Sequence, residues 1–258
     1  MDPDTRDWPL PANTRGLLPR LPALGRNEVV VVEVGLEIAE AVRQPLHSIL
    51  DEDERTRAAR FLFPDHRRRY LAAHGALRLV LAHYLDEDPR MLRFERGTHG
   101  KVRLARRLAG DYEINLSHSA ERALIAVARA REVGIDIEVH RSDVDIHALA
   151  QYVLSPAEQC AFAAVPAADR RAAFFRAWAR KESFVKAIGE GLACPLESFD
   201  ISLDEHINSA LLECRHMPAG AAHWTTIPLD VGAGAAAALT ARGPLCLQRR
   251  AASVWTFA

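Results

Sequence analysis

Periodic hydrophobic positions divide the chain into predicted helices and strands. Leucines recur on one side of the stretch from Asp65 to Leu85 and arginines occupy the other side, which predicts a long amphipathic helix. The β-branched run from Val29 to Val34 predicts a buried strand. Apolar runs at 123–128 and 133–139 predict two more strands, and we expect these two to pair with each other in an antiparallel arrangement.

The rest of the pattern predicts a second long helix and several short elements. Ser155-Pro-Ala-Glu158 has the form of a capping box and predicts a helix start. The stretch from Asp169 to Ile188 predicts a helix that ends at Gly189. The prolines of residues 1–27 predict an irregular arm. Shorter elements are predicted as a polar helix at 51–61 and as strands at 92–94, 112–116, 199–203, 211–215, 223–227, 235–240 and 254–257.

The sequence Gly134-Ile-Asp-Ile-Glu138 lies within one predicted strand. Successive side chains of a strand alternate between its faces, so Asp136 and Glu138 project on one side and the two isoleucines enter a core. Two carboxylates at this spacing repel each other unless a cation lies between them, and Mg²⁺ prefers oxygen ligands of this kind. The same alternation is typical of a half-exposed strand, so this stretch alone leaves both interpretations open.

A second stretch, Trp178-Ala-Arg-Lys-Glu-Ser-Phe-Val-Lys186, adds a third carboxylate. Glu182 and Lys186 are one helical turn apart and share a face of the predicted helix. A carboxylate with two ammonium groups beside it, together with the acidic strand, suits a metal-bound polyphosphate; an ordinary solvated Glu–Lys pair is the alternative. Only three of the 33 Lys and Arg residues are lysines, and two of them flank Glu182. This bias favours positions that require a compact ammonium group.

Candidate phosphate ligands also precede the acidic strand. Arg57, Arg60 and Arg69 form a dense basic cluster, which is typical of a phosphate-binding group. The turn at 97–101 carries a lysine, and the segment Asn115-Leu-Ser-His-Ser119 ends a predicted strand with a hydroxyl and an imidazole. No nucleophile elbow surrounds this Ser-His pair, so the sequence does not indicate a hydrolase triad.

Composition and charge narrow the class of protein. The chain has 258 residues, of which 49% are hydrophobic and 26% charged, which is typical of one large domain or two small ones. A formal net charge of −1 provides no overall field for binding nucleic acid. The four cysteines are scattered without a C-x-x-C pair, so we expect reduced thiols in a cytoplasmic protein and no zinc site. We expect no membrane span and no signal peptide, because no apolar run is long enough and the N-terminus is acidic and proline-containing.

Together these motifs resemble the paired signature of the Sfp-type 4′-phosphopantetheinyl transferases. The acidic strand and the spacing W-x-x-K-E-S-x-x-K-x-x-G from Trp178 to Gly189 carry the resemblance, and the second motif is the more specific of the two. The resemblance extends from about residue 51 to residue 199. Further matching segments occur in the same order, at Arg60-Phe61, Arg69-Tyr70, Gly100-Lys101 and Asn115–Ser119.

The resemblance implies a mixed α/β (α+β) fold of two similar halves related by a pseudo-twofold axis. Each half would be a long helix packed on a small, mainly antiparallel sheet. The boundary would fall near Val139, which divides the chain into an arm at 1–27, an N-terminal half at 28–139 and a C-terminal half at 140–258. Coenzyme A and Mg²⁺ would bind in the cleft between the halves. Because one chain would supply both sides of the cleft, we expect a monomer.

The resemblance also implies a reaction. A holo-[acyl-carrier-protein] synthase type transferase moves the 4′-phosphopantetheine arm of coenzyme A to a serine of an acyl or peptidyl carrier protein and releases adenosine 3′,5′-bisphosphate. Asp136, Glu138 and Glu182 would hold Mg²⁺, for which Mn²⁺ could substitute, and Glu182, Lys186 and Asp136 would be the catalytic residues. Either Glu182 or a water on the metal would take the serine proton. The residues expected to bind the coenzyme are Arg57, Arg60, Arg69, Lys101, Ser117, His118 and Lys186.

Two positions depart from the family pattern, and two other functions stay open at this point. Val102 follows Lys101 where proline is frequent, and Glu54 stands where some relatives carry a basic residue. The first alternative is a Mg²⁺-dependent phosphohydrolase that uses water as acceptor on a nucleotide or on the coenzyme A pyrophosphate. The second is a non-catalytic protein that binds coenzyme A. For the transferase, the acceptor could belong to fatty acid, polyketide or nonribosomal peptide synthesis.

Overall fold

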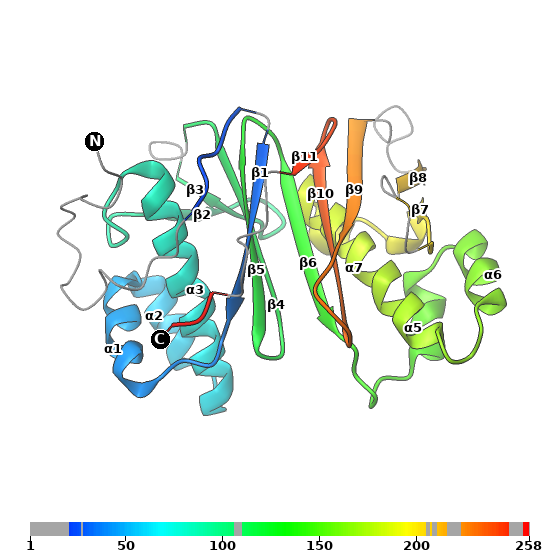
Figure 1. Ribbon diagram of the computed structural model, residues 1–258, viewed down its shortest axis with the longest axis horizontal. Helices are drawn as coiled ribbons and strands as arrows, with labels where there is room; N and C mark the ends of the chain where they lie inside the picture. The colour runs from blue at the N-terminus through cyan, green and yellow to red at the C-terminus, as the bar shows by residue number, and fades with distance from the viewer. Residues whose placement is uncertain are drawn as a thin grey trace.

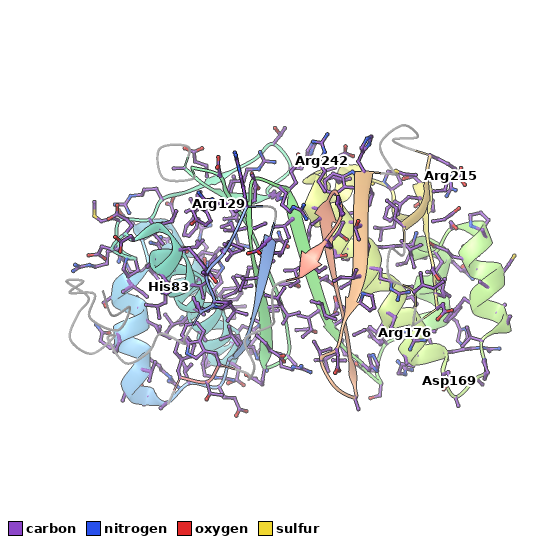
Figure 2. The ribbon with its side chains drawn as sticks, turned by 45° about the horizontal axis from the view of Figure 1, so that its top comes forward. His83, Arg129, Asp169, Arg176, Arg215 and Arg242 are labelled. Atoms are coloured by element: carbon purple, nitrogen blue, oxygen red, sulfur yellow. The ribbon has the colours of Figure 1, made fainter. Side chains whose placement is uncertain are left out.

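Two mainly antiparallel sheets pack against each other in the middle of the molecule, and one long helix covers the outer face of each (Figure 1). This computed structural model describes residues 21–26, 28–105, 110–204, 207, 211–215, 223–247 and 255–257. Side chains fill the space between the sheets and under both helices (Figure 2). In the first strand, Val29 and Val31 enter the core between the sheets while Val30 and Val32 pack under the helix, because side chains of a strand alternate between faces.

The first sheet has the strand order β11-β1-β5-β4, and helix α3 covers it. Strands β1, β5 and β4 are antiparallel neighbours, and β11 adds in parallel to β1. A separate antiparallel pair, β2-β3, follows α3 in the chain. The elements of this half are β1 (Glu28–Gly35), α1 (Glu40–Ile49), α2 (Glu52–Ala59), α3 (Pro64–Leu85), β2 (Phe94–Arg96), β3 (Val102–Leu104), β4 (Tyr112–Ser119) and β5 (Arg122–Arg129).

The second sheet has the strand order β6-β10-β9, and helix α7 covers it. All its neighbouring strands are antiparallel. The pair β7-β8 follows α7, as β2-β3 follows α3. The elements are β6 (Val133–Val139), α5 (Ile146–Val153), α6 (Pro156–Ala164), α7 (Arg170–Ile188), the 3₁₀ turns η2 (Gly191–Ala193) and η3 (Leu196–Ser198), β7 (Phe199–Ile201), β8 (Leu211–Cys214), β9 (Trp224–Leu229), β10 (Ala235–Arg242) and β11 (Cys246–Leu247).

The two sets of elements repeat one arrangement. Each begins with a strand, continues through short helices to a long helix, adds a two-stranded ribbon, and ends in a hairpin whose last strand pairs with the first. The orders β1-β5-β4 and β6-β10-β9 are therefore equivalent, as a pseudo-twofold relationship requires. This repeat confirms the predicted mixed α/β fold of two similar halves, each with a long helix on a small antiparallel sheet.

The structure differs from the sequence-based expectations in two respects: which strands pair, and where the chain divides into halves. The predicted pair of strands at 123–128 and 133–139 is wrong, because both edges of β5 are occupied by β1 and β4, and β6 pairs with β10 instead. Hydrophobic alternation fixes which face a strand buries and leaves its partner unspecified. Since β6 belongs to the second sheet, the repeat divides the described residues between β5 and β6, ahead of the boundary that we predict near Val139.

The ends of the described chain pack against the first half. Pro22 accepts a hydrogen bond from Tyr84 through its carbonyl at 3.0 Å, and Leu24 is buried in the first core. At the C-terminus, Trp255 forms one bridge with Val34, while the start of the predicted strand at 254–257 lies outside the described residues. Most of the arm predicted at 1–27 also lies outside them. No helix in the described part of the chain is long and apolar enough to cross a bilayer.

Candidate active site

The acidic strand β6 lies directly against helix α7, which places its carboxylates beside Glu182 and Lys186. A Cβ atom at Gly134 would stand 2.1 Å from the Ser183 carbonyl oxygen, a distance that no real side chain tolerates. Only glycine therefore allows the helix backbone to approach the strand this closely. The same sequence motif thus supplies the acids and the close packing that brings the helix to them.

Asp136 is buried at the centre of this contact. Its Oδ1 accepts hydrogen bonds from Lys186 Nζ at 2.7 Å and from Ser117 Oγ at 2.8 Å, and the lysine also donates to the Ser117 hydroxyl at 2.9 Å. Its Oδ2 is buried and has no hydrogen-bond partner within the described residues. A buried carboxylate oxygen without a donor is costly, so this atom is suited to an external cation or donor.

The other two carboxylates are only partly neutralised. Burial, and then repulsion from Asp136, raise the pKa of Glu138 to about 7, against a hydrogen bond from Ser119 Oγ at 3.2 Å. Burial and the charge of Asp136 also raise the pKa of Glu182, while Lys186 lowers it. The three acids therefore act on one another, and a cation between them would relieve the repulsion.

These residues fit a hard divalent cation that is partly coordinated by substrate. Within the described ranges no group of three or more His, Cys, Asp or Glu side chains forms a ready-made metal site. Mg²⁺ is commonly held by one or two carboxylates together with phosphate oxygens and water, so a closed protein cage is not required. The oxygen donors of Asp136, Glu138 and Glu182 and the orphaned Oδ2 match that kind of coordination.

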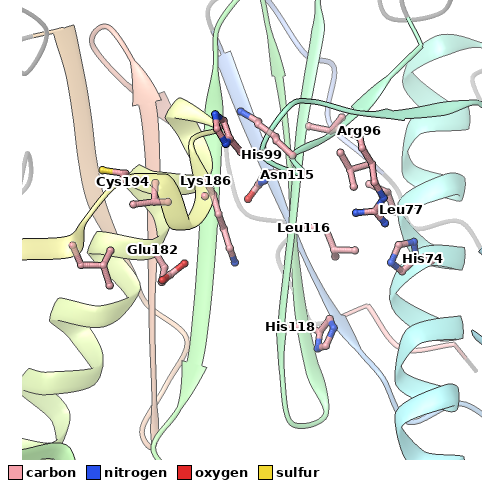
Figure 3. Close-up of a pocket in the computed structure, with 18 of the residues that line it drawn as sticks. His74, Leu77, Arg96, His99, Asn115, Leu116, His118, Glu182, Lys186 and Cys194 are labelled. Carbon is pink, nitrogen blue, oxygen red and sulfur yellow. The ribbon is translucent and has the colours of Figure 1, made fainter. Parts of the chain in front are cut away.

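A cavity of about 590 Å³ opens between the two halves and is lined by Glu182 and Lys186 of this cluster. This volume lies within the usual range for small-molecule sites. Glu182 and Lys186 line one side, His74, Leu77 and Arg96 line the opposite side, and His118 and Asn115 lie between them (Figure 3). The remaining lining residues are Arg57, His99, Gly100, Lys101, Val102, Ile114, Leu116, Val185, Gly189, Gly191, Cys194, Pro195 and Leu196.

His118 and Lys101 reach the cavity in different ways. Burial lowers the pKa of His118, and nearby positive groups lower it further. Lys101 Nζ donates to the carbonyl oxygens of Ala187 at 2.9 Å and Val133 at 3.1 Å, and burial lowers its pKa to about 8. Lys101 thus ties the turn at 97–101 to the end of α7 and the start of β6.

The three arginines predicted to bind phosphate do not converge. Arg57 lines the cavity, with its guanidinium 5.9 Å from the centre of the Tyr70 ring. Arg60 is exposed at the end of α2 and is not among the lining residues. Arg69 is paired with Glu121, to which its Nε donates at 2.8 Å. Arg57 and Arg69 are therefore engaged by protein groups on two different sides of α3.

Sequence reasoning missed His74 and Arg96, which line the cavity from α3 and β2. His74 stacks on Tyr70, with ring centroids 4.0 Å apart, and its Nδ1 lies 3.1 Å from Glu54 Oε1. The departure from the family pattern at Glu54 thus holds a histidine of the cavity wall. No local motif marks either residue, because tertiary packing alone brings them to the cavity.

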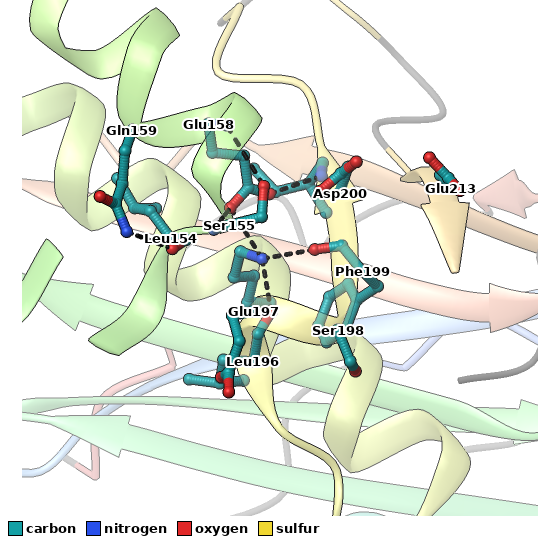
Figure 4. A network of polar contacts seen from close by, with 12 residues as sticks. Leu154, Ser155, Glu158, Gln159, Leu196, Glu197, Ser198, Phe199, Asp200 and Glu213 are labelled. Carbon is teal, nitrogen blue, oxygen red and sulfur yellow. Dashed lines mark hydrogen bonds and ion pairs between the residues drawn. The ribbon is translucent and has the colours of Figure 1, made fainter. Parts of the chain in front are cut away.

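Lys181 is not part of this cluster, although it flanks Glu182. Its side chain is fully buried, 2.8 Å from Glu158 Oε2, and donates to the carbonyl oxygens of Leu196 and Phe199 at 2.7 Å each. Figure 4 labels these three partners. The interpretation of both flanking lysines as ligands of a polyphosphate is therefore wrong for Lys181. Its ammonium group is satisfied by Glu158 and two carbonyl oxygens, and Lys181 is not among the lining residues of the cavity.

Comparison with known proteins defines the class to which this fold and site belong. Residues 132–240 match the model of the 4′-phosphopantetheinyl transferase superfamily, and residues 40–130 match the model of the 4′-phosphopantetheinyl transferase N-terminal region. The two matches meet at the junction of β5 and β6, where the structural repeat also divides. The chain belongs to the 4′-phosphopantetheinyl transferase family and is an enzyme of that class.

Individual relatives carry the same name. The chain is 39% identical over 189 residues to the 4′-phosphopantetheinyl transferase HetI of a Nostoc species, which covers 72% of this chain and 79% of the relative. It is 30% identical over 162 residues to a 4′-phosphopantetheinyl transferase of Bacillus subtilis, with 62% and 70% coverage. It is 34% identical over 126 residues to 4′-phosphopantetheinyl transferase AcpT of Salmonella typhimurium, with 49% and 62% coverage. These relatives confirm the family that the sequence motifs resemble.

Proposed function

We propose that this transferase moves the 4′-phosphopantetheine arm of coenzyme A to a serine of an acyl or peptidyl carrier protein and releases adenosine 3′,5′-bisphosphate. The observation that carries the proposal is the cluster of three carboxylates and Lys186, of which Glu182 and Lys186 line the cavity between the halves. A phosphodiester anion resists attack by a nucleophile unless its charge is neutralised, and this cluster is arranged for that purpose. The proposal extends the family membership to a donor, an acceptor and a metal.

In this proposal Asp136, Glu138 and Glu182 hold Mg²⁺ or Mn²⁺. When bound, the ion would neutralise the pyrophosphate oxygens of coenzyme A and make the phosphorus more electrophilic. The orphaned Oδ2 of Asp136 and the raised pKa of Glu138 support this assignment, because both reflect a site that lacks positive charge. Lys186 supplies one positive charge to Asp136 and leaves the other two acids in need of more.

Lys186 and Glu182 have further roles at the reacting atoms. The ammonium group of Lys186 faces the cavity, where it can neutralise the departing phosphate. Glu182 is one turn away on the same helix, and the raised pKa of its carboxyl group makes it a stronger base than an ordinary glutamate. We assign to Glu182 the removal of the proton from the attacking serine hydroxyl.

Residues of the N-terminal half would hold the coenzyme. His118 and Arg57 line the cavity and have polar groups available to phosphate oxygens. Lys101 lines the same cavity, and Ser117 is bonded to the lining residue Lys186. The hydrogen bonds of Ser117 to Asp136 and of Lys101 to backbone carbonyls would be shared with or exchanged for the ligand. Arg60 and Arg69 remain in the proposal as outer contacts to the adenosine 3′-phosphate. One chain supplies both walls of the cavity, which supports a monomer.

The test is the intact mass of an unmodified carrier protein after incubation with this chain, coenzyme A and Mg²⁺. We expect a gain of one phosphopantetheine group, which a chelator and the Asp136→Ala variant abolish. Asp143→Asn is the matched control, because Asp143 follows the same strand but is exposed and paired with Arg141. This control should retain the transfer.

Two outcomes would contradict the proposal. Consumption of coenzyme A without any gain of mass, on carriers from fatty acid, polyketide and peptide synthesis, would indicate a phosphohydrolase. Absence of both consumption and gain, combined with tight binding of coenzyme A in a calorimetric titration, would indicate a non-catalytic binding protein. Full transfer by Asp136→Ala would remove this residue from the site.

A further inference from the structure

The outer edge of β6 is satisfied by side chains and not by a neighbouring strand. In an antiparallel pair, alternate residues of a strand direct their backbone groups to the partner and the others direct them outward. The pairing of β6 with β10 leaves residues 133, 135, 137 and 139 facing outward, since His140 donates its backbone N–H to Gly234 across the pair. The isoleucines at 135 and 137 are buried, so their outward amides need partners.

Strand β4 of the other half provides these partners through its side chains. Asn115 Oδ1 accepts from the Ile135 amide at 2.9 Å. Ser117 Oγ accepts from the Ile137 amide at 3.4 Å, and Ser119 Oγ accepts from the Val139 amide at 3.1 Å. The three side chains share one face of β4 because they are two residues apart, which matches the spacing of the amides.

The three hydrogen bonds from amides of β6 to the side chains of Asn115, Ser117 and Ser119 form a ladder between the strands. The two serine hydroxyls connect this ladder to the carboxylates. A hydroxyl has one proton, so an oxygen that accepts from an amide directs its own proton elsewhere. Ser117 Oγ lies 2.8 Å from Asp136 Oδ1, and Ser119 Oγ lies 3.2 Å from Glu138 Oε2. The contact that fixes the edge of β6 therefore also fixes one oxygen of each acid. The acids stand on the second half, and the groups that orient them stand on the first.

We propose that Asn115 and Ser119 are positioning residues: through the outer edge of β6 they set the register between the halves, and Ser119 also orients Glu138 for metal binding. This inference rests on the proposed function for its metal, while the register can be measured without any ligand. Asn115 acts on the strand, since its Oδ1 bonds to the Ile135 amide. Ser119 acts on both the strand and the acid.

The first measurement is backbone amide hydrogen exchange by NMR on the full chain without ligand. Ser119→Ala should accelerate exchange of the Val139 amide by roughly five- to tenfold, the amount expected for loss of one hydrogen bond, and leave the Ile135 amide within a factor of about two. Asn115→Ala should do the reverse. Asn115→Asp keeps an acceptor oxygen and should retain protection of Ile135.

The second measurement is binding of Mn²⁺ alone, followed by electron paramagnetic resonance of the free ion. Ser119→Ala should raise the dissociation constant roughly tenfold, as loss of a group that orients a metal ligand commonly does, and Ser119→Thr should restore it because the hydroxyl is kept. Thr225→Ala is the matched control: it removes a partly buried hydroxyl that donates to the Gly243 carbonyl at 2.9 Å, on strand β9, which β10 separates from β6. It should change neither Mn²⁺ binding nor the three amides.

The outcomes separate this inference from the proposed function. Unchanged exchange at Val139 and unchanged Mn²⁺ affinity in Ser119→Ala would overturn the positioning role even if the chain transfers phosphopantetheine. Changed exchange without changed affinity would overturn the link to Glu138. If Ser119→Ala fails to fold, Asn115→Ala and Asn115→Asp still test the ladder, and equal protection of Ile135 in both would overturn it. If the ladder is intact but the chain transfers no phosphopantetheine, only the proposed function would be overturned.

Discussion

Each long helix carries a fully buried cation that pairs with a glutamate, Arg78 in α3 and Lys181 in α7, and the two halves hold these two cations in the same way; α7 also buries Arg180. Both pair with the glutamate of the capping box that begins the preceding short helix. Arg78 Nε donates to Glu54 Oε2 at 2.6 Å, and Lys181 Nζ lies 2.8 Å from Glu158 Oε2. Both also donate to backbone carbonyls of the segment after their helix, at Pro89 and Leu92 for the arginine and at Leu196 and Phe199 for the lysine.

The residue that follows each cation differs, and this difference separates scaffold from chemistry. Leu79 follows Arg78 and is buried in the first core, whereas Glu182 follows Lys181 and lines the cavity. The buried cation fixes the long helix against its capping box and its ribbon in both halves. The repeated network is therefore scaffold, and the candidate chemistry is added at a few positions of the second copy.

The strands show the same contrast. Glu33 on β1 is buried and paired with Arg122, whose Nε donates to Oε1 at 3.0 Å. Glu138 on β6 has only a serine hydroxyl as its hydrogen-bond partner within the described residues. The first half thus neutralises its acid with an internal cation. The second half leaves its acid incompletely neutralised, which is the condition for binding a cation from outside.

The largest effect should come from Glu182→Gln, which removes the chemistry and keeps the scaffold. Loss of a general base typically lowers a rate by about 10²–10⁴-fold, and we expect a fall of this size in phosphopantetheine transfer. Stability should not decrease, because burial already penalises the charged carboxylate. The measurements are the transfer rate and urea unfolding. A variant with the wild-type rate would show that Glu182 takes no proton.

The next largest effect should come from Arg78→Met, which removes the buried cation of the network in the first half. It leaves Glu54 and Asp51 without their buried partner, so the free energy of unfolding should fall by about 3–5 kcal/mol. Lys181→Met leaves only Glu158 without its buried cation, so the free energy of unfolding should fall by less. Urea unfolding measures both variants. A larger loss for Lys181→Met than for Arg78→Met would contradict the view that the two networks are equivalent apart from the number of acids.

Local periodicity predicts the two long helices and the shared strand face of the acids, whereas the two-fold repeat is an implication of the family resemblance and the helices α1 and α5 are missed. Alternation alone places Asp136 and Glu138 on one face of a strand, and helical spacing alone places Glu182 near Lys186. Helix geometry also argues against a role for Lys181 beside Glu182, because consecutive residues of a helix point about 100° apart and do not share a face. Of the three lysines, Lys181 is buried against Glu158, and Lys101 donates to backbone carbonyl groups.

Strand partners and distant cavity residues could not be predicted in this way. The pairing of β6 with β10 joins segments about a hundred residues apart, and nothing in either strand specifies the other. His74 and Arg96 reach the cavity only because α3 and β2 fold beside it. The sequence identifies Asn115–Ser119 as a polar strand end, whereas its use as a ladder for the edge of β6 depends on the docking of the halves.

Stability should depend on pH through the unneutralised acid of the second half. The folded-state pKa of Glu138 is raised to about 7 from an ordinary value of 4.5, so the folded chain binds more protons than the unfolded chain between these values. The free energy of unfolding should therefore fall as pH rises from 4.5 to 7, by about 1–2 kcal/mol after allowance for solvent screening. Glu138→Gln should flatten this part of the profile.

Repeating the pH-dependent unfolding measurement with Mg²⁺ tests whether Glu138 binds the ion. Urea unfolding across pH 4.5–8, with and without the ion, should show stabilisation that is largest near pH 8, where Glu138 is ionised. Glu33→Gln is the comparison on β1; it strands Arg122 and should lower stability without changing the response to Mg²⁺. A Mg²⁺ effect that persists in full in Glu138→Gln would exclude this residue as a ligand.

The smallest effect should come from substitutions in the capping boxes. They test the difference between a capping residue that also pairs with the buried cation and one that only caps its helix. Ser155 Oγ accepts from the Glu158 amide at 3.2 Å, and Ser155→Ala should lower the free energy of unfolding by about 1 kcal/mol. Asp51 caps α2 in the same way but also pairs with Arg78, so Asp51→Ala should cost more in the wild-type chain. In the Arg78→Met background that additional loss should disappear, because only the cap remains to be removed. Urea unfolding of the double-variant cycle measures this coupling, and a cost for Asp51→Ala that is the same in both backgrounds would mean that the first half holds its cation through Glu54 alone.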